Sequence, residues 1–280
     1  MLKTLRRRIM GDLLLSLESN QRRGSKPRCH WLTHGKPEEV AARMTAIIEP
    51  WGSVSVDDHW MPDGFAITDE AQLHKAPGLF STPDHCRIIR DWWFKIVRGG
   101  RQTAPSIDIA STCTVDGKAG ILLIEAKAHD LELIDEEKGK PLKSDSTIGE
   151  QTNHDHIGGA IANANQPLSD ATRVKWSLSR DSRYQMSNRF ATACKLTELG
   201  YPVIVLYLGF LNAEDMRFGG RTPLASHHEW FTLVTDHSAP LFPKDVWNNV
   251  HKVHGQPLIP IIRSMVIPHD SPCVTCEVQE

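Results

Sequence analysis

Two acidic residues and a lysine interrupt a stretch of strand-forming sequence between residues 105 and 129. Within this stretch, Asp116-Gly117 separates two runs typical of β-strands, and Asp-Gly in such a place is a strong signal for a hairpin turn. With the turn centred between these two residues, the numbers of facing residues sum to 233, so Asp108 lies opposite Glu125. Side chains alternate between the faces of a strand, which puts Lys127 on the same face as Glu125.

Two carboxylates that face each other across antiparallel strands repel, because their Cβ atoms are only about 4.5–5.5 Å apart. A cation must hold them together, and a divalent metal with oxygen ligands is the natural candidate. A metal bound by Asp108, Glu125 and the backbone carbonyl of Ala126 could polarise a phosphate and lower the pKa of a bound water. Lys127, next to two carboxylates, is expected to stay protonated and to position that water or offset developing charge. The set suits phosphodiester hydrolysis.

The apolar run at 121–124 distinguishes this Glu-x-Lys tripeptide from a second one at 136–138, which lies in a charged segment with no facing acid. His129 continues the face of Lys127 and could contact a water or a phosphate, or simply end the strand. A different interpretation of the same residues is an exposed edge hairpin, in which Asp108 or Glu125 pairs with Lys127 at the surface.

Other segments must position these residues. Thr82-Pro83-Asp84 is a typical helix start, and Gly99-Gly100 is a typical end. The segment 130–152 is polar and reads as an exposed loop, whereas the apolar run at 202–208 is typical of a strand buried on both faces. Further helices are expected at 36–49, 154–164, 182–199 and 244–253. Hairpin, helix and buried strand in this order predict a mixed α/β sheet covered by helices.

The helix expected at 182–199 carries polar residues at positions i, i+3 and i+4, which fall on one face: Gln185, Asn188 and Arg189. In the functional interpretation, Gln185 supports the metal site while Arg189 and Asn188 contact nucleic acid. The alternative is a solvated helix face.

Asp108, followed by sixteen residues and then Glu125-Ala126-Lys127, resembles the signature of the PD-(D/E)XK nuclease superfamily, which has the restriction-endonuclease-like fold. The resemblance covers roughly residues 80–210. The sequence departs from the pattern in having Ile107 before the acid, where the family name implies proline. One branch of the superfamily has Gln-x-x-x-Tyr on the flanking helix, and here Arg189 takes the place of the tyrosine.

The resemblance implies a Mg²⁺-dependent DNA endonuclease, with Mn²⁺ able to substitute. It implies that Asp108, Glu125, Lys127 and Gln185 are the catalytic residues, and that Arg189, Asn188 and His129 lie toward the nucleic acid. Many members also use an acid from an earlier helix to bind metal, for which Glu39 is the best-placed candidate and Glu49 the next. Cutting both strands usually takes two active sites, which favours a homodimer or a partner subunit.

The composition of the 280 residues is that of an ordinary globular protein, expected to comprise an N-terminal helical and basic segment (1–79), a nuclease core (80–235) and a C-terminal extension (236–280). The net charge of −2 gives no global attraction to nucleic acid. The first 28 residues hold eight basic residues against two acidic ones, which reads as a basic arm or as a solvated amphipathic helix. Scattered cysteines and the lack of a long apolar run favour a cytoplasmic protein with no membrane helix.

Two other motifs are set aside. Residues 153–159 resemble a metallo-β-lactamase-type motif, but Gln151 and Asn153 stand where its two further histidines belong. Cys273 and Cys276 have zinc-ligand spacing but lack two further ligands nearby in the sequence, so free thiols are the simpler interpretation. Two other functions stay open: an inactive nucleic-acid-binding or assembly subunit with the same fold, and a metal-dependent hydrolase that acts on another substrate.

Overall fold

The computed structural model describes residues 12–75, 78–96 and 106–269, which form a mixed α/β fold. Its central sheet has six strands in the order β1-β4-β5-β6-β8-β7. The strands are β1 (Trp60–Met61), β4 (Ile109–Val115), β5 (Lys118–Lys127), β6 (Val203–Phe210), β7 (His251–Val253) and β8 (Gln256–Met265). The pairs β5–β6 and β6–β8 are parallel, and the other pairs are antiparallel. A separate two-stranded ladder joins β2 (Ala71–Gln72) to β3 (Ser106–Ile107).

The hairpin of β4 and β5 has the predicted register. Its ladder runs from Val115 opposite Lys118 to Ile109 opposite Ile124, so facing numbers sum to 233 throughout. Asp116 and Gly117 both have positive φ, at 49° and 72°, as a two-residue hairpin turn requires. The turn chemistry therefore sets which strand residues face each other.

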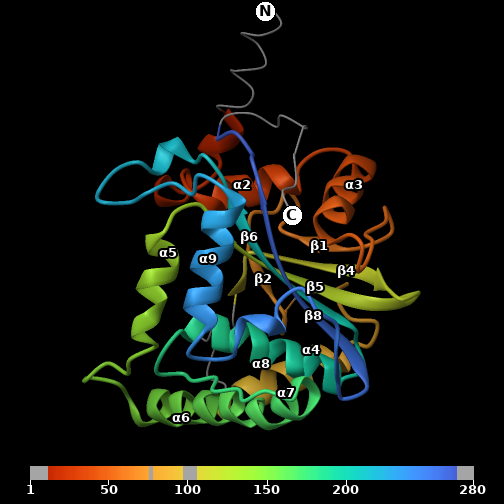
Figure 1. Cartoon of the computed structure of the whole chain (residues 1–280), viewed down its shortest axis with the longest axis vertical. Coiled ribbons are helices and arrows are strands. Elements are labelled where there is room, and N and C mark those ends of the chain that lie inside the picture. The colour runs from red at the N-terminus through yellow and green to blue at the C-terminus, as the bar shows by residue number, and fades with distance from the viewer. Residues whose placement is uncertain (1–11, 76–77, 97–105, 270–280) are drawn as a thin grey trace, which may run out of the picture.

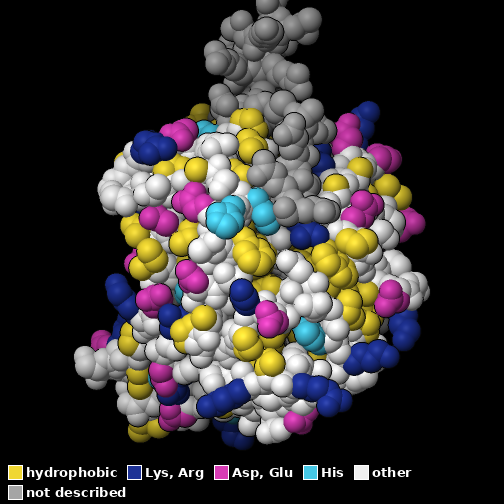
Figure 2. Space-filling model, viewed as in Figure 1, with side chains coloured by type: hydrophobic (Ala, Val, Ile, Leu, Met, Phe, Trp, Pro, Cys, Tyr) yellow, Lys and Arg dark blue, Asp and Glu magenta, His cyan; other side chains and the backbone are white. Residues whose placement is uncertain are grey.

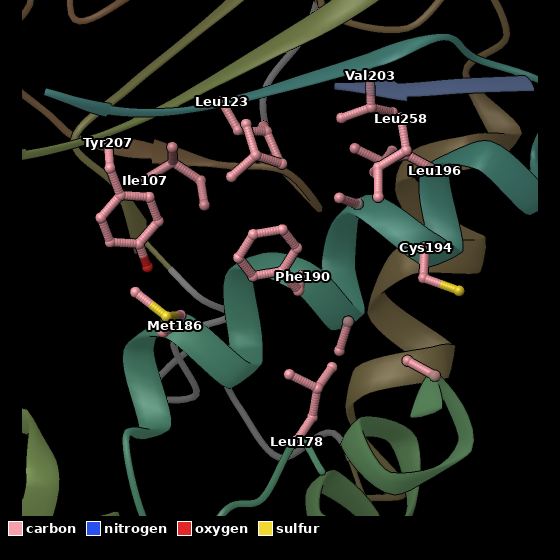
Figure 3. Packing of buried hydrophobic residues seen from close by; sticks show 14 of the residues in the cluster. Ile107, Leu123, Leu178, Met186, Phe190, Cys194, Leu196, Val203, Tyr207 and Leu258 are labelled. Carbon is pink, nitrogen blue, oxygen red and sulfur yellow. The ribbon is translucent and has the colours of Figure 1, made fainter. Parts of the chain in front are cut away.

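Helices cover both faces of the sheet (Figure 1). One face packs against α4 (Asp84–Trp93), α6 (Ile148–Asn163), α7 (Asn165–Thr172), α8 (Tyr184–Glu198) and α9 (His227–Ser238), and the other against α2 (Ser25–Leu32) and α3 (Pro37–Ile48). Alternate residues of β5 enter the two clusters, with Leu123 on the α8 side and Ile124 on the α3 side. Figure 3 shows Phe190 of α8 pointing toward Leu123 of the sheet.

Most of the predicted elements are present, and the differences have local causes. The predicted helices at 36–49 and 182–199 and the buried strand are confirmed as α3, α8 and β6. The helix at residue 84 ends at Trp93, earlier than expected, and residues 97–105 lie outside the described chain. The predicted start of α6 is too late, because Thr147 and Glu150 form a capping box that begins the helix at Ile148. Within the polar segment before it, α5 (Leu131–Ile134) and the 3₁₀ turn η2 (Asp135–Lys138) form.

The predicted helix at 244–253 is wrong. Residues there form a short 3₁₀ turn, η4 (Lys244–Val246), followed by strand β7. Asn248 has a φ of 58°, a left-handed conformation that breaks a helix. The segment expected as an extension beyond 235 thus supplies β7 and β8 to the central sheet, just as β1 comes from the residues before 80.

Two of the basic residues near the N-terminus form ion pairs inside the fold. Arg28 is buried and its guanidinium lies 2.6 Å from Asp215, while Lys26 Nζ donates to Glu70 Oε1 at 2.6 Å. Lys26 and Arg28 are therefore not solvated cations of a free arm, and residues 1–11 lie outside the described chain. Over the described ranges, no helix has the length and apolar character needed to cross a membrane. The four described cysteines are unpaired, and Cys113 and Cys194 are buried, as predicted.

Close packing of α9 on β6 depends on a glycine. A Cβ at Gly209 would lie 2.6 Å from Cγ of Trp230, whose indole N–H donates to the Tyr207 carbonyl at 3.2 Å. Gly209→Ala is expected to lower the free energy of unfolding by about 1–3 kcal/mol, the usual cost of overpacking. The control is Gly159→Ala at an exposed position of α6, where a Cβ meets nothing within 4 Å and a stabilisation of up to about 1 kcal/mol is expected. Equal urea midpoints for the two variants would contradict this packing.

Candidate active site

Asp108 lies at the bend between β3 and β4, where two ladders meet. The last pair of the β4–β5 ladder is Ile109 with Ile124, so the next position places Asp108 opposite Glu125. Asp108 Oδ2 accepts the backbone N–H of Ala126 at 2.8 Å. This hydrogen bond holds the Asp108 carboxylate at the end of β5, next to Ala126, the residue between Glu125 and Lys127.

Glu125 and Lys127 form a buried ion pair on the face of β5 that packs against α8. Their side chains are 1% and 8% exposed, and Lys127 Nζ donates to Glu125 Oε1 at 2.5 Å. The same ammonium donates to Oε1 of Gln185, in the first turn of α8, at 2.8 Å. The alternative of an exposed surface hairpin is therefore wrong. Gln185 contacts Lys127, and its role in supporting a metal site stays a prediction.

Arg189 takes the second oxygen of Glu125. Its Nε donates to Glu125 Oε2 at 2.6 Å, and its Nη2 donates to the Ser106 carbonyl at 2.6 Å. Asn188 is also buried, and its Oδ1 accepts from Arg189 Nη1 at 3.3 Å. The alternative of a solvated helix face is wrong. Arg189 and Asn188, predicted to contact nucleic acid, are both engaged inside the protein, so that role stays a prediction.

Burial and charge act in opposite directions on the two acids. Burial alone would raise the pKa of Glu125, but Arg189 and Lys127 outweigh it and hold this pKa below its usual value. Burial, and then the charge of Glu125, raise the pKa of Asp108 to about 7, against the opposing effects of Lys127 and the Ala126 N–H. The folded chain thus binds this proton more tightly than the unfolded chain, so ionisation of Asp108 weakens the fold as the pH rises from about 4 to about 7.

The cations that hold the acids are side chains of this protein. Lys127 and Arg189 neutralise Glu125, so the repulsion between the acids does not by itself require a metal. In the described part of the chain, no cluster of three or more His, Cys, Asp or Glu side chains is arranged to hold a metal ion. The pair still fits hydrated Mg²⁺, which usually binds through one or two carboxylates and keeps several waters. Burial, and then the charge of Glu125, raise the pKa of Asp108 to about 7, so a cation at this carboxylate would favour its ionised form.

The structure does not bring the predicted earlier acid to this point. Glu39 is exposed on α3, which packs against the opposite face of the sheet from Glu125 and Lys127. Glu49 lies beside the hairpin turn, where it lines a pocket with Asp116 and Gly117, at the other end of β5. Neither residue is placed to share a metal with Asp108.

His129 is buried beyond the end of β5 and turns toward a different group of residues. Its Nε2 lies 3.6 Å from Glu132 and its Nδ1 lies 3.9 Å from Asp130. Burial lowers the pKa of His129, the charge of Glu132 opposes this, and Arg221 lowers the pKa further. The predicted contact of His129 with nucleic acid therefore has no support from its surroundings and stays a prediction.

Glu70 is the acidic neighbour that sequence reasoning missed. The β2–β3 ladder pairs Ala71 with Ile107, and its next position brings Glu70 opposite Asp108. The charge of Glu70 contributes to the raised pKa of Asp108. Glu70 and Ser106 also line a polar pocket of about 300 Å³. The sequence carried no signal for this, because β2 is two residues long in a turn-rich segment.

The proposed zinc-ligand pair, Cys273 and Cys276, lies outside the described residues. Cys29 and His30, a pair of potential zinc ligands near the other end of the sequence, are buried in α2, where His30 Nδ1 is 2.9 Å from the Gly64 carbonyl. In the rejected metallo-β-lactamase-type segment, the Nε2 atoms of His154 and His156 lie 2.9 and 3.0 Å from the carbonyls of Lys140 and Trp92. No protein-family model, curated protein or solved structure matches this chain.

Proposed function

We propose that this chain is a metal-dependent nuclease with a restriction-endonuclease-like core, and that its substrate is DNA. The observation that carries the proposal is the meeting of Asp108 with the buried pair of Glu125 and Lys127 at the end of an antiparallel hairpin. The order of elements supports it, since β4 and β5 are followed by helices and then by β6, which pairs parallel to β5. The resemblance to the PD-(D/E)XK superfamily implies the same order.

Hydrolysis of a phosphodiester needs an attacking water and positive charge at the phosphoryl oxygens. Mg²⁺ or Mn²⁺, held by Asp108, Glu125 and the Ala126 carbonyl, would supply Lewis-acid stabilisation and a water of lowered pKa. Lys127 would position that water and offset the charge that develops on the phosphate. Gln185 fixes the Lys127 ammonium by accepting a hydrogen bond from it, which keeps the charge aimed at one place.

The decisive assay incubates the purified chain with plasmid DNA and Mg²⁺. Cleavage or nicking is expected for the wild type and is expected to be lost in Asp108→Asn. At limiting Mg²⁺ the rate should fall about tenfold per pH unit below pH 7, because the metal must displace the proton that Asp108, with its pKa of about 7, then holds. Asp116→Asn is the matched control, since asparagine suits its exposed turn with a φ of 49°. No cleavage by the wild type of any DNA or RNA form would refute the proposal.

A catalytically inactive nucleic-acid-binding or assembly subunit is the second candidate. It is favoured by the ion pairs on both oxygens of Glu125, which leave this carboxylate neutralised without a metal. On the face in Figure 2, basic and acidic side chains are mixed over the upper part, while basic ones gather along the lower edge. Calorimetry distinguishes the two functions, because an inactive subunit need not take up Mn²⁺ at Asp108. A homodimer or partner subunit stays a prediction.

A further inference from the structure

Arg189 occupies the position on Glu125 that a metal would need. Its Nε lies 2.6 Å from Glu125 Oε2, and the other oxygen of this carboxylate accepts from Lys127 at 2.5 Å. The guanidinium is also anchored to the Ser106 carbonyl and its side chain is 5% exposed. An oxygen that accepts a charged hydrogen bond at this distance has a strong donor where a metal would approach, and two cations already flank it.

Two features show that this pairing is built into the fold. Arg189 extends from the middle of α8, a helix whose neighbouring residues Met186 and Phe190 are part of the core, so the backbone beneath it is fixed. Glu125 is held from the strand side by Lys127, so removal of Arg189 would still leave one cation on this carboxylate. Arg189 is thus a second counter-charge that a divalent cation could replace.

We propose that Arg189 is an internal counter-ion that competes with the divalent metal for Glu125. The inference rests on the proposed metal-dependent function and adds a regulation to it. In the metal-free protein, Arg189 neutralises Glu125 and keeps the site folded. When the metal binds, Nε and Nη2, which both lie 2.6 Å from Glu125 Oε2, give up this carboxylate, while the Ser106 carbonyl still accepts from Nη2 and keeps the guanidinium next to the site. Arg189 is therefore a positioning residue whose contact with Glu125 weakens metal affinity.

The test measures Mn²⁺ binding by calorimetry for the wild type and for Arg189→Met, without DNA. The methionine variant is expected to bind Mn²⁺ at least about tenfold more tightly, a usual size for coupling between two sites. Arg189→Lys, which keeps the charge, should stay close to the wild type. Lys195→Met is the matched control, because it removes a cation from the same helix that pairs with Glu198 at 2.7 Å.

If Arg189 served only to hold the site together, its replacement would loosen the site. Mn²⁺ binding by Arg189→Met would then be weaker than in the wild type. Equal or weaker binding by Arg189→Met overturns the inference, even when the wild type binds metal and cuts DNA. If Arg189→Met binds Mn²⁺ and the wild type does not, the inference is supported and the nuclease proposal for the wild type is refuted. Absence of binding in both proteins refutes both.

A second measurement uses the wild type, in case Arg189→Met fails to fold. The Nε–H signal of Arg189 in ¹⁵N NMR reports its hydrogen bond to Glu125. Saturating Mg²⁺ is expected to shift this signal and to speed its exchange with solvent, whereas the Nε–H signal of Arg217, paired with Glu214 at the surface, should not move. An unchanged Arg189 signal at saturation overturns the proposed competition.

Discussion

Replacement of Lys127 by methionine is expected to lower the rate of DNA cleavage by roughly 10²–10⁴-fold, the usual loss when a group that acts on the transition state is removed. Methionine keeps the length and apolar stem of the side chain but removes the ammonium that donates to Glu125 and Gln185. Single-turnover cleavage at saturating Mg²⁺ measures the effect on the chemical step. Binding of DNA, measured separately by fluorescence anisotropy, should change far less.

Lys118→Met is the control for this experiment, because Lys118 is an exposed residue of the same strand. It should cut DNA at the wild-type rate. If Lys127→Met and Lys118→Met cleave equally fast, Lys127 has no part in the reaction and the assignment of the site is wrong.

Replacement of Glu125 by glutamine is expected to destabilise the protein by about 3–5 kcal/mol, the cost of breaking a buried ion pair from one side. Glutamine has nearly the same shape, but it leaves the buried guanidinium of Arg189 and the ammonium of Lys127 without their shared counter-charge. Urea denaturation monitored by tryptophan fluorescence gives the free energy of unfolding. Glu39→Gln, at an exposed position of α3, should stay within about 0.5 kcal/mol of the wild type.

A double variant separates the charge effect from the loss of packing. Glu125→Gln with Arg189→Met removes both partners, so its destabilisation is expected to be smaller than the sum for the two single variants. Strictly additive free energies would show that the two side chains do not interact, contrary to the 2.6 Å contact between Arg189 Nε and Glu125 Oε2.

Much of the site could be predicted from sequence because its geometry is local. The Asp-Gly turn fixes the register of β4 and β5, and that register alone brings Asp108 to Glu125 and Lys127. The spacing of Gln185 and Arg189 on α8 correctly grouped two residues that both reach the end of β5. Periodicity also identified the buried strand β6 and the helices on either side of the sheet.

What sequence could not supply were contacts between distant segments. The sequence pattern suggests a metal as the counter-charge of Glu125 and does not indicate that Arg189, 64 residues away, contacts this carboxylate. Glu70 was missed for the same reason, and Glu39 was favoured although α3 packs on the opposite face. Strand β7 is hard to predict because it is only three residues long and its pairing with β8 sets its conformation, and the ten-residue β8 is hard to predict because Pro257 and Pro260 interrupt its apolar run.

The central claim is that Asp108 and Glu125 share a divalent metal. A crystal of the protein soaked in Mn²⁺ and measured at the manganese absorption edge tests it most directly. The account predicts an anomalous peak within coordination distance, about 2.0–2.3 Å, of oxygens from both carboxylates, with Arg189 withdrawn from Glu125. A map without a peak between the two acids, with Arg189 still bound to Glu125 at a Mn²⁺ concentration that supports cleavage, would contradict it.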